Sequence, residues 1–162
     1  MAEHLEIAEG GKMEKYALLL RQIQVLVEME KDLTAVLANT VAMIHFTFGF
    51  LWTGFYIVKG DCLVVGPFQG PLACNRIRYG KGVCGTSWKE GRTITVEDVD
   101  KFPEHIACSS ESKSEIVVPV MAGNEVKAVI DIDSDELSRF DEADALWLER
   151  IAAIIAPLFE KP

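Results

Sequence analysis

The sequence has no long apolar run and no basic segment followed by an apolar one. Its longest apolar runs are short and interrupted by charge, well below the ~20 residues that a membrane-spanning helix needs. The first residues, MAEHLEIAEGGKMEKY, lack the basic and apolar regions of a secretory signal peptide. We therefore expect a soluble, cytoplasmic protein with no membrane partner.

Positive charge is also scarce. The chain has 16 lysine and arginine residues against 25 acidic residues, which gives a formal net charge of −9. A field of this sign repels a phosphate backbone unless a local basic patch opposes it. We therefore expect no nucleic-acid partner.

Closely spaced metal ligands are absent as well. Zinc sites usually take paired ligands two to four residues apart, and the four cysteines and three histidines form no such pairs. These spacings disfavour a metal site, and none is expected. Stable disulfides are rare in a reducing compartment, so each cysteine is interpreted as a packing residue, a metal ligand or a redox thiol.

The length and composition fit one domain. The chain has 162 residues, of which 49% are hydrophobic, and one domain typically takes ~100–200 residues. Residues 1–12 are polar and end in glycine, which indicates a loose N-terminal tail before a domain at 13–162. Apolar positions three and four residues apart predict a helix over 13–29 and, after an Asp32 cap, a second helix over 33–44.

Strand patterns follow these helices. Two hairpins are predicted, the first from strands at 50–58 and 62–66 and the second from strands at 115–122 and 125–134. Shorter elements are expected between the hairpins, namely strands at 76–79 and 92–98, a helix at 83–90 and an irregular segment at 100–114. A final helix is expected after an Asp141 cap and continues to Leu158. Helices at both ends of antiparallel hairpins indicate an α+β domain.

The cysteines differ in their surroundings. Cys62 lies in an apolar strand pattern and is interpreted as a buried packing residue. Cys74, Cys84 and Cys108 lie in glycine-rich or polar segments: Cys74 has two arginines close by, Cys84 lies at an expected helix start, and Cys108 precedes two serines. Cations and helix N-termini lower the pKa of a thiol and favour the nucleophilic thiolate, although loop cysteines without a function remain the alternative. His105 precedes Cys108 by three residues and, with no third partner, is interpreted as a surface histidine.

The strand at 125–134 carries a pair of acidic residues. Asp131 and Asp133 are two residues apart and therefore point to one face of a strand, while the isoleucines beside them point to the other. Glu115 begins the preceding strand and is expected nearby. Such carboxylates could bind an α-ammonium group or donate a proton, or they could form a solvated strand edge. Trp52 lies in an aromatic strand. It is interpreted either as a core residue or as the apolar wall of a ligand site.

Three segments of the chain together resemble the free methionine-(R)-sulfoxide reductases, a family of single GAF-domain enzymes. The segments are GPFQGPLAC, RIRYGKGVCGTSW and IACSSESKSEIVVPV, and they place three cysteines ten and twenty-four positions apart. The likeness extends from the strand of Trp52 to Asp133. It implies a GAF-type α+β domain, with an antiparallel sheet of about six strands flanked by the terminal helices.

The resemblance also implies roles for the cysteines. The cysteine matching Cys108 is the nucleophile, which attacks the sulfoxide sulfur and becomes a sulfenic acid. The one matching Cys74 resolves this acid by forming an intramolecular disulfide, and the one matching Cys84 is a further recycling thiol. Thioredoxin is the implied reductant, with no bound cofactor.

Further roles concern the substrate. Positions matching Glu115, Asp131 and Asp133 hold the sulfoxide oxygen and the amino group of the free amino acid, and Trp52 matches the tryptophan that packs on the S-methyl group. GAF domains often pair, so a homodimer through the terminal helices is a further expectation, although burial within one chain explains their apolar stripes equally well. The alternative function is a non-catalytic GAF sensor that binds a small ligand and carries redox-sensitive cysteines. A structural metal-binding domain is a third class, poorly supported by the spacings.

Overall fold

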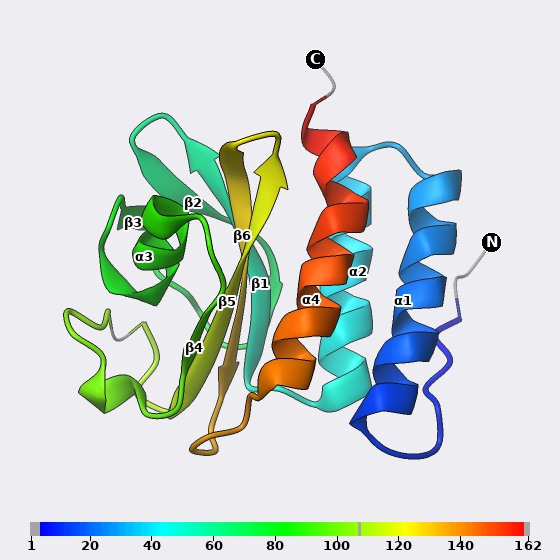
Figure 1. The fold of residues 1–162 in the computed structure, drawn as a ribbon, viewed down its shortest axis with the longest axis horizontal. Helices are drawn as coiled ribbons and strands as arrows, with labels where there is room; N and C mark the ends of the chain where they lie inside the picture. The colour runs from blue at the N-terminus through cyan, green and yellow to red at the C-terminus, as the bar shows by residue number, and fades with distance from the viewer. Residues whose placement is uncertain (1–3, 107, 161–162) are drawn as a thin grey trace.

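The computed structural model describes residues 4–106 and 108–160, so the two ends of the chain, 1–3 and 161–162, lie outside it. A central sheet has helices on both faces (Figure 1). The helical elements are α1 (Lys12–Met29), α2 (Leu33–Phe48), α3 (Gly82–Glu90), α4 (Glu142–Ile155) and the 3-10 turns η1 (Val99–Lys101) and η2 (Ala156–Phe159). The strands are β1 (Trp52–Lys59), β2 (Cys62–Gln69), β3 (Arg76–Arg78), β4 (Ile94–Val96), β5 (Ser114–Ala122) and β6 (Glu125–Ser134).

The sheet is six-stranded and antiparallel throughout, in the order β3-β2-β1-β6-β5-β4. Helices α2 and α4 cover one face, and α1 packs outside them (Figure 1). Helix α3 and the long loops cover the other face (Figure 1). The predicted α+β fold, with its sheet flanked by terminal helices, is confirmed.

Two apolar layers lie on the two faces of the sheet. Ile130 and Ile132 point into the layer shared with α1, α2 and α4, whereas Val129 belongs to the layer under α3. Because side chains alternate along a strand, Asp131 and Asp133 point to the α3 face. The predicted separation of isoleucines and carboxylates on β6 is therefore confirmed, and it places the carboxylates under the loops.

The expected caps fix the starts of two helices. The Asp32 side chain accepts a hydrogen bond from the backbone of Ala35, and Asp141 accepts bonds from the first turn of α4.

At the N-terminus, Gln22 of α1 exchanges two 2.8 Å hydrogen bonds with the backbone of Glu6, so this part of the expected tail lies against the first helix.

Two strands, β2 and β4, differ in length from the sequence pattern. The second strand of the first hairpin was predicted at 62–66 but extends through Pro67 to Gln69. Proline is tolerated there because β3 pairs with β2 only through residues 62–64, which leaves the outer side of position 67 without a ladder partner. The strand predicted at 92–98 is shorter, since only Ile94–Val96 pair with β5.

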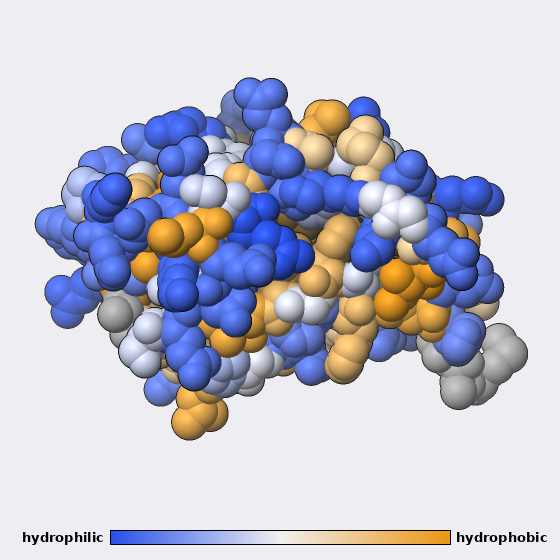
Figure 2. Space-filling model, turned by 90° about the horizontal axis from the view of Figure 1, so that it is seen from below, coloured by the Kyte–Doolittle hydropathy of each residue, from blue (hydrophilic) through white to orange (hydrophobic). Residues whose placement is uncertain are grey.

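On the face shown in Figure 2, hydrophilic residues predominate and apolar residues form smaller patches. Among the helices of residues 4–106 and 108–160, none combines the length and apolar character needed to cross a membrane. Among the described residues, most large apolar side chains lie in the two layers, and the most exposed exceptions are Leu72, at 89%, and Met29, at 73%.

Candidate functional site

The three central strands bring the predicted substrate residues together. Trp52 on β1 pairs with Asp133 on β6, and Asp133 pairs with Glu115 on β5, so the three residues form one row across the sheet. Asp131 lies one step along the same face, opposite Gly54. The site is thus built on the rigid centre of the sheet, from residues far apart in sequence.

Gly54 allows the Trp52 ring to lie across its own strand. A Cβ at position 54 would overlap the indole and would lie 2.6 Å from the Cβ of Phe68, closer than real contacts allow. The indole nitrogen donates a 3.0 Å hydrogen bond to the carbonyl of Pro71, and the ring stacks on Tyr56 and Phe68 with centroid distances of 5.8 and 5.2 Å. Trp52 is therefore a fixed aromatic wall, as the ligand-site interpretation requires.

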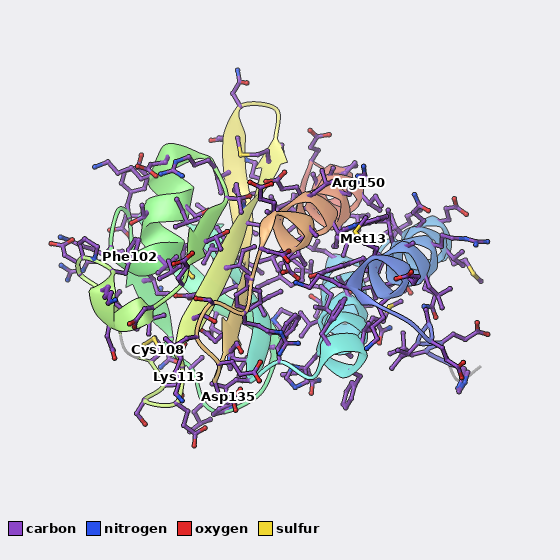
Figure 3. The ribbon with its side chains drawn as sticks, turned by 60° about the horizontal axis from the view of Figure 1, so that its bottom comes forward. Met13, Phe102, Cys108, Lys113, Asp135 and Arg150 are labelled. Atoms are coloured by element: carbon purple, nitrogen blue, oxygen red, sulfur yellow. A yellow bond between two sulfur atoms is a disulfide. The ribbon has the colours of Figure 1, made fainter. Side chains whose placement is uncertain are left out.

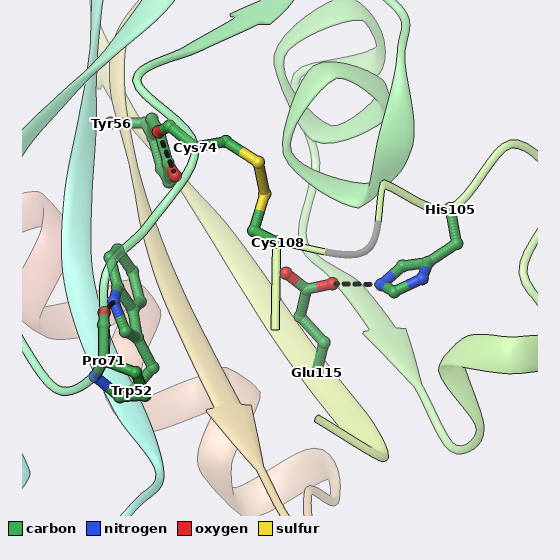
Figure 4. The surroundings of a disulfide bond; sticks show 7 residues. All are labelled: Trp52, Tyr56, Pro71, Cys74, His105, Cys108 and Glu115. Carbon is green, nitrogen blue, oxygen red and sulfur yellow. Dashed lines mark hydrogen bonds and ion pairs between the residues drawn. A yellow bond between two sulfur atoms is a disulfide. The ribbon is translucent and has the colours of Figure 1, made fainter. Parts of the chain in front are cut away.

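Cys74 and Cys108 are joined by a disulfide, with their Cα atoms 5.4 Å apart. It connects the loop after β2 to the loop before β5, on the α3 side of the sheet and away from the helices that carry Met13 and Arg150 (Figure 3). The hydroxyl of Tyr56 donates a 2.8 Å hydrogen bond to the carbonyl of Cys74, which ties this loop to β1. Figure 4 shows the Glu115 side chain directed from β5 toward the disulfide.

Cys84 is a free thiol in the first turn of α3 and is only 3% exposed. The helix lies close to the chain before it, because a Cβ at Gly85 would lie 2.5 Å from the carbonyl oxygen of Arg78. Burial, and then the charges of Asp131 and Glu115, raise the pKa of Cys84 well above its usual value. The expectation of a lowered pKa is therefore wrong here. Lys81, the nearest cation in sequence, pairs with Glu104 instead, at 3.2 Å.

The carboxyl groups share one poorly solvated region. Glu115 and Asp131 are 6% and 5% exposed, which excludes the solvated-edge alternative for these two residues. Burial, followed by the charges of Asp131 and Asp133, raises the pKa of Glu115 well above its ordinary range. Burial also raises the pKa values of Asp131 and Asp133, the latter with a contribution from the Asp131 charge. The cluster therefore keeps protons at pH values where exposed carboxyl groups have lost them.

Three contributors to the site were missed. His105 was predicted at the surface, but its side chain is only 15% exposed and its Nε2 lies 4.0 Å from Oε1 of Glu115 (Figure 4). Ser112 donates a 2.9 Å hydrogen bond to Asp133. Tyr56 was predictable from the sequence, because it lies two positions after Gly54 and four after Trp52 and therefore shares their face of the strand. No sequence pattern indicated the two loop residues, His105 and Ser112.

One cavity collects the predicted residues. Trp52, Cys84, Cys108, Glu115, Asp131 and Asp133 all line it, and Cys74 joins it through the disulfide. Cys62 lies outside, buried beside Arg76, whose guanidinium is 3.4 Å from the sulfur. The cavity has an aromatic wall, an acidic floor and a reducible bond at its rim, so it suits a small cationic molecule and thiol chemistry.

This fold is that of a GAF domain, and the GAF-domain family profile matches residues 29–160. The chain is 51% identical over 96% of its length to GAF domain-containing protein A of Dictyostelium discoideum, covering 99% of that protein. It is 43% identical to the free methionine-R-sulfoxide reductase of Escherichia coli, covering 88% of this chain and 87% of that one.

A solved structure extends this similarity. The free methionine-R-sulfoxide reductase of Neisseria meningitidis, in complex with its substrate, superposes with a TM-score of 0.94 at 48% identity, over 97% of this chain and 95% of that chain. The chain therefore belongs to the free methionine-R-sulfoxide reductase family.

Proposed function

We propose that this protein reduces free L-methionine (R)-sulfoxide to L-methionine and that Cys108 is its nucleophile. The observation that carries the proposal is the Cys74–Cys108 disulfide, which lies at the rim of a cavity floored by Glu115 and Asp131. Reduction of a sulfoxide by a thiol ends in such a disulfide, beside the place where the substrate was bound. The relatives named as reductases of this substrate support the same assignment.

The reaction takes two thiols, whose two hydrogens leave with the sulfoxide oxygen as one molecule of water. The Cys108 thiolate attacks the sulfoxide sulfur, the oxygen passes to Cys108 as a sulfenic acid, and methionine leaves with its sulfur reduced by two electrons. The Cys74 thiol then attacks the sulfenic sulfur, and water leaves as the disulfide forms. A dithiol protein of the thioredoxin class restores both thiols by exchange, with Cys84 as a further thiol for this recycling.

The cavity provides the remaining functions. Glu115 or Asp133 supplies a proton to the departing oxygen, because burial and the neighbouring carboxyl charges raise the pKa values of both groups and favour their protonated forms. Asp131 pairs with the α-ammonium group, and the Trp52 ring packs against the S-methyl group. A methionine sulfoxide within a peptide has no ammonium group, so binding it would leave a buried carboxylate unpaired.

A coupled assay tests the proposal. The protein, thioredoxin, thioredoxin reductase and NADPH are combined with the free R sulfoxide, the free S sulfoxide or a peptide-bound sulfoxide. NADPH consumption is expected only with the free R form. Cys108→Ser is expected to abolish it, whereas Cys62→Ser, which changes a free thiol outside the cavity, is expected to keep it.

Other outcomes would contradict the proposal. Equal rates with both epimers, or full activity in Cys108→Ser, would refute the assignment of substrate or nucleophile. Binding of the R sulfoxide without any turnover would favour the sensor function instead. Methionine formation with a chemical dithiol but not with thioredoxin would refute only the choice of reductant. The cytoplasmic location and the homodimer stay predictions.

A further inference from the structure

The floor of the cavity places a thiol between carboxylates. One ligand atom each from Cys84, Glu115 and Asp131 lies within 4.8 Å of the other two, and all three residues are buried. They come from α3, β5 and β6, three elements that the fold brings together. The spacing argument against zinc concerned ligands close in sequence and does not apply to such a set.

A second observation points to a missing cation. Oδ1 of Asp131 has no hydrogen-bond partner among the described residues, although the residue is only 5% exposed. The basic side chains at this cavity are His105, whose Nε2 lies 4.0 Å from Glu115, and Lys81, which is paired with Glu104; neither lies within ion-pair distance of Asp131. An unpartnered carboxylate oxygen in a poorly solvated site is costly, and a bound cation would remove that cost.

We propose that Cys84, Glu115 and Asp131 bind Zn²⁺ when the substrate is absent. Zinc bonds of about 2.0–2.3 Å in a tetrahedron place neighbouring ligand atoms roughly 3.3–3.8 Å apart, so small side-chain rotations bring this set into range. A thiolate with two carboxylates suits a borderline-soft ion, whereas Mg²⁺ and Ca²⁺ take all-oxygen sites. Three protein ligands leave the fourth position of zinc to solvent.

Occupancy of this site has a consequence for the activity. Resting on the proposed function, Zn²⁺ and the α-ammonium group of the substrate both need Asp131, so they exclude one another. Zinc is therefore a competitive inhibitor rather than a cofactor, and it also holds the Cys84 thiolate away from recycling. The binding itself needs no turnover and can be measured on inactive protein.

The oxidised protein gives the sharpest test. With Cys74 and Cys108 joined in the disulfide, the free thiols of the described residues are Cys84 and Cys62. Co²⁺, a spectroscopic substitute for Zn²⁺, is titrated into this form, and a thiolate-to-cobalt charge-transfer band is expected to appear and to disappear on adding Zn²⁺. Cys84→Ser is expected to lose the band, while the matched control Cys62→Ser keeps it.

A second variant keeps the zinc site testable if Cys84→Ser does not fold. Asp131→Asn keeps the shape of the side chain and is expected to weaken Zn²⁺ binding by at least the roughly 10- to 100-fold seen when an outer partner of a metal site is lost. Native far-UV circular dichroism is checked for each variant. Free methionine sulfoxide is expected to raise the apparent Zn²⁺ dissociation constant of the wild type in proportion to its concentration.

The contrary results are equally distinct. Three results would overturn the zinc site: folded wild-type protein gives no charge-transfer band, the band survives in Cys84→Ser, or the band is lost in Cys62→Ser. Zinc binding that methionine sulfoxide leaves unchanged would overturn the shared use of Asp131. The metal-free coupled assay reads the reductase activity separately, so failure of one proposal is not mistaken for failure of the other.

Discussion

Asp131→Asn is expected to stabilise the oxidised, substrate-free protein while it removes activity. Carboxylate oxygens of Glu115 and Asp131 lie within 4.8 Å of each other in a buried site. Two unit charges 4.8 Å apart repel by about 3.5 kcal/mol at an effective dielectric constant of about 20. Protonation relieves part of this repulsion, so the expected gain in the free energy of unfolding is about 1–3 kcal/mol at pH 8.

The gain depends on pH in a defined direction. Burial raises the folded-state pKa values of Glu115 and Asp131, so the folded protein holds protons that the unfolded chain has released. Stability from these groups is therefore complete below the ordinary carboxyl range near pH 4 and is lost as the pH rises through the raised values. Asp131→Asn removes one of the two groups, so its advantage should grow from pH 4 to pH 8.

Urea denaturation of metal-free, oxidised protein at pH 4, 6 and 8 measures this effect. Asp135→Asn is the matched control, because Asp135 is exposed on the chain just beyond β6 and its substitution should change stability by less than about 0.5 kcal/mol. A variant no more stable than wild type at pH 8, or one whose gain is largest at pH 4, would refute the argument that repulsion between these carboxyl groups limits stability.

Two further predictions concern the wall of the site and the helical layer. Gly54→Ala is expected to displace the Trp52 ring, because the new methyl group occupies the space of the ring. The variant should keep the fold and raise KM for the free R sulfoxide at least several-fold. Unchanged kinetics and unchanged tryptophan fluorescence would contradict this prediction. Asp144→Ala removes the 2.6 Å hydrogen bonds from Tyr16 and Lys12 that join α1 to α4. In urea denaturation it is expected to lower the free energy of unfolding by about 2–4 kcal/mol, whereas the control Glu28→Ala, at an exposed position, is expected to change it by less than about 0.5 kcal/mol. Equal effects of the two substitutions would contradict this prediction.

Local patterns were sufficient to predict much of the fold. Apolar residues three and four apart mark α1, caps at Asp32 and Asp141 mark two helix starts, and the β5–β6 hairpin follows from alternation around a Gly-Asn turn. The strand ends were less predictable, because they depend on which neighbour is present. Pro67 remains in β2 only because β3 is too short to pair with it.

The site was predictable where side-chain alternation applies and not elsewhere. The common face of Asp131 and Asp133 follows from period two, and strand pairing adds Glu115. The burial of Cys84 does not follow from its glycine-rich sequence, because it results from packing of α3 over the sheet. The contact of His105 with Glu115 depends on the path of an irregular loop, on which no periodic pattern acts.

A stability cost at the site follows from its chemistry. The cluster of Glu115, Asp131 and Asp133 is unfavourable in the empty protein, and the same cluster binds an ammonium group and holds a proton for a departing oxygen. Strain of this kind is typical of functional sites, where activity is maintained at the expense of stability. The zinc proposal and the Asp131→Asn prediction both rest on this crowding of buried carboxyl groups, and each tests it with a different readout.

A single turnover without reductant tests the central claim most directly. Fully reduced protein is mixed with excess free methionine (R)-sulfoxide, and methionine and the disulfide are quantified by chromatography and peptide mapping. One equivalent of methionine per protein is expected, together with the Cys74–Cys108 disulfide, and none from the S epimer. No methionine from the R epimer, or methionine formed at the wild-type rate by Cys108→Ser, would contradict the account.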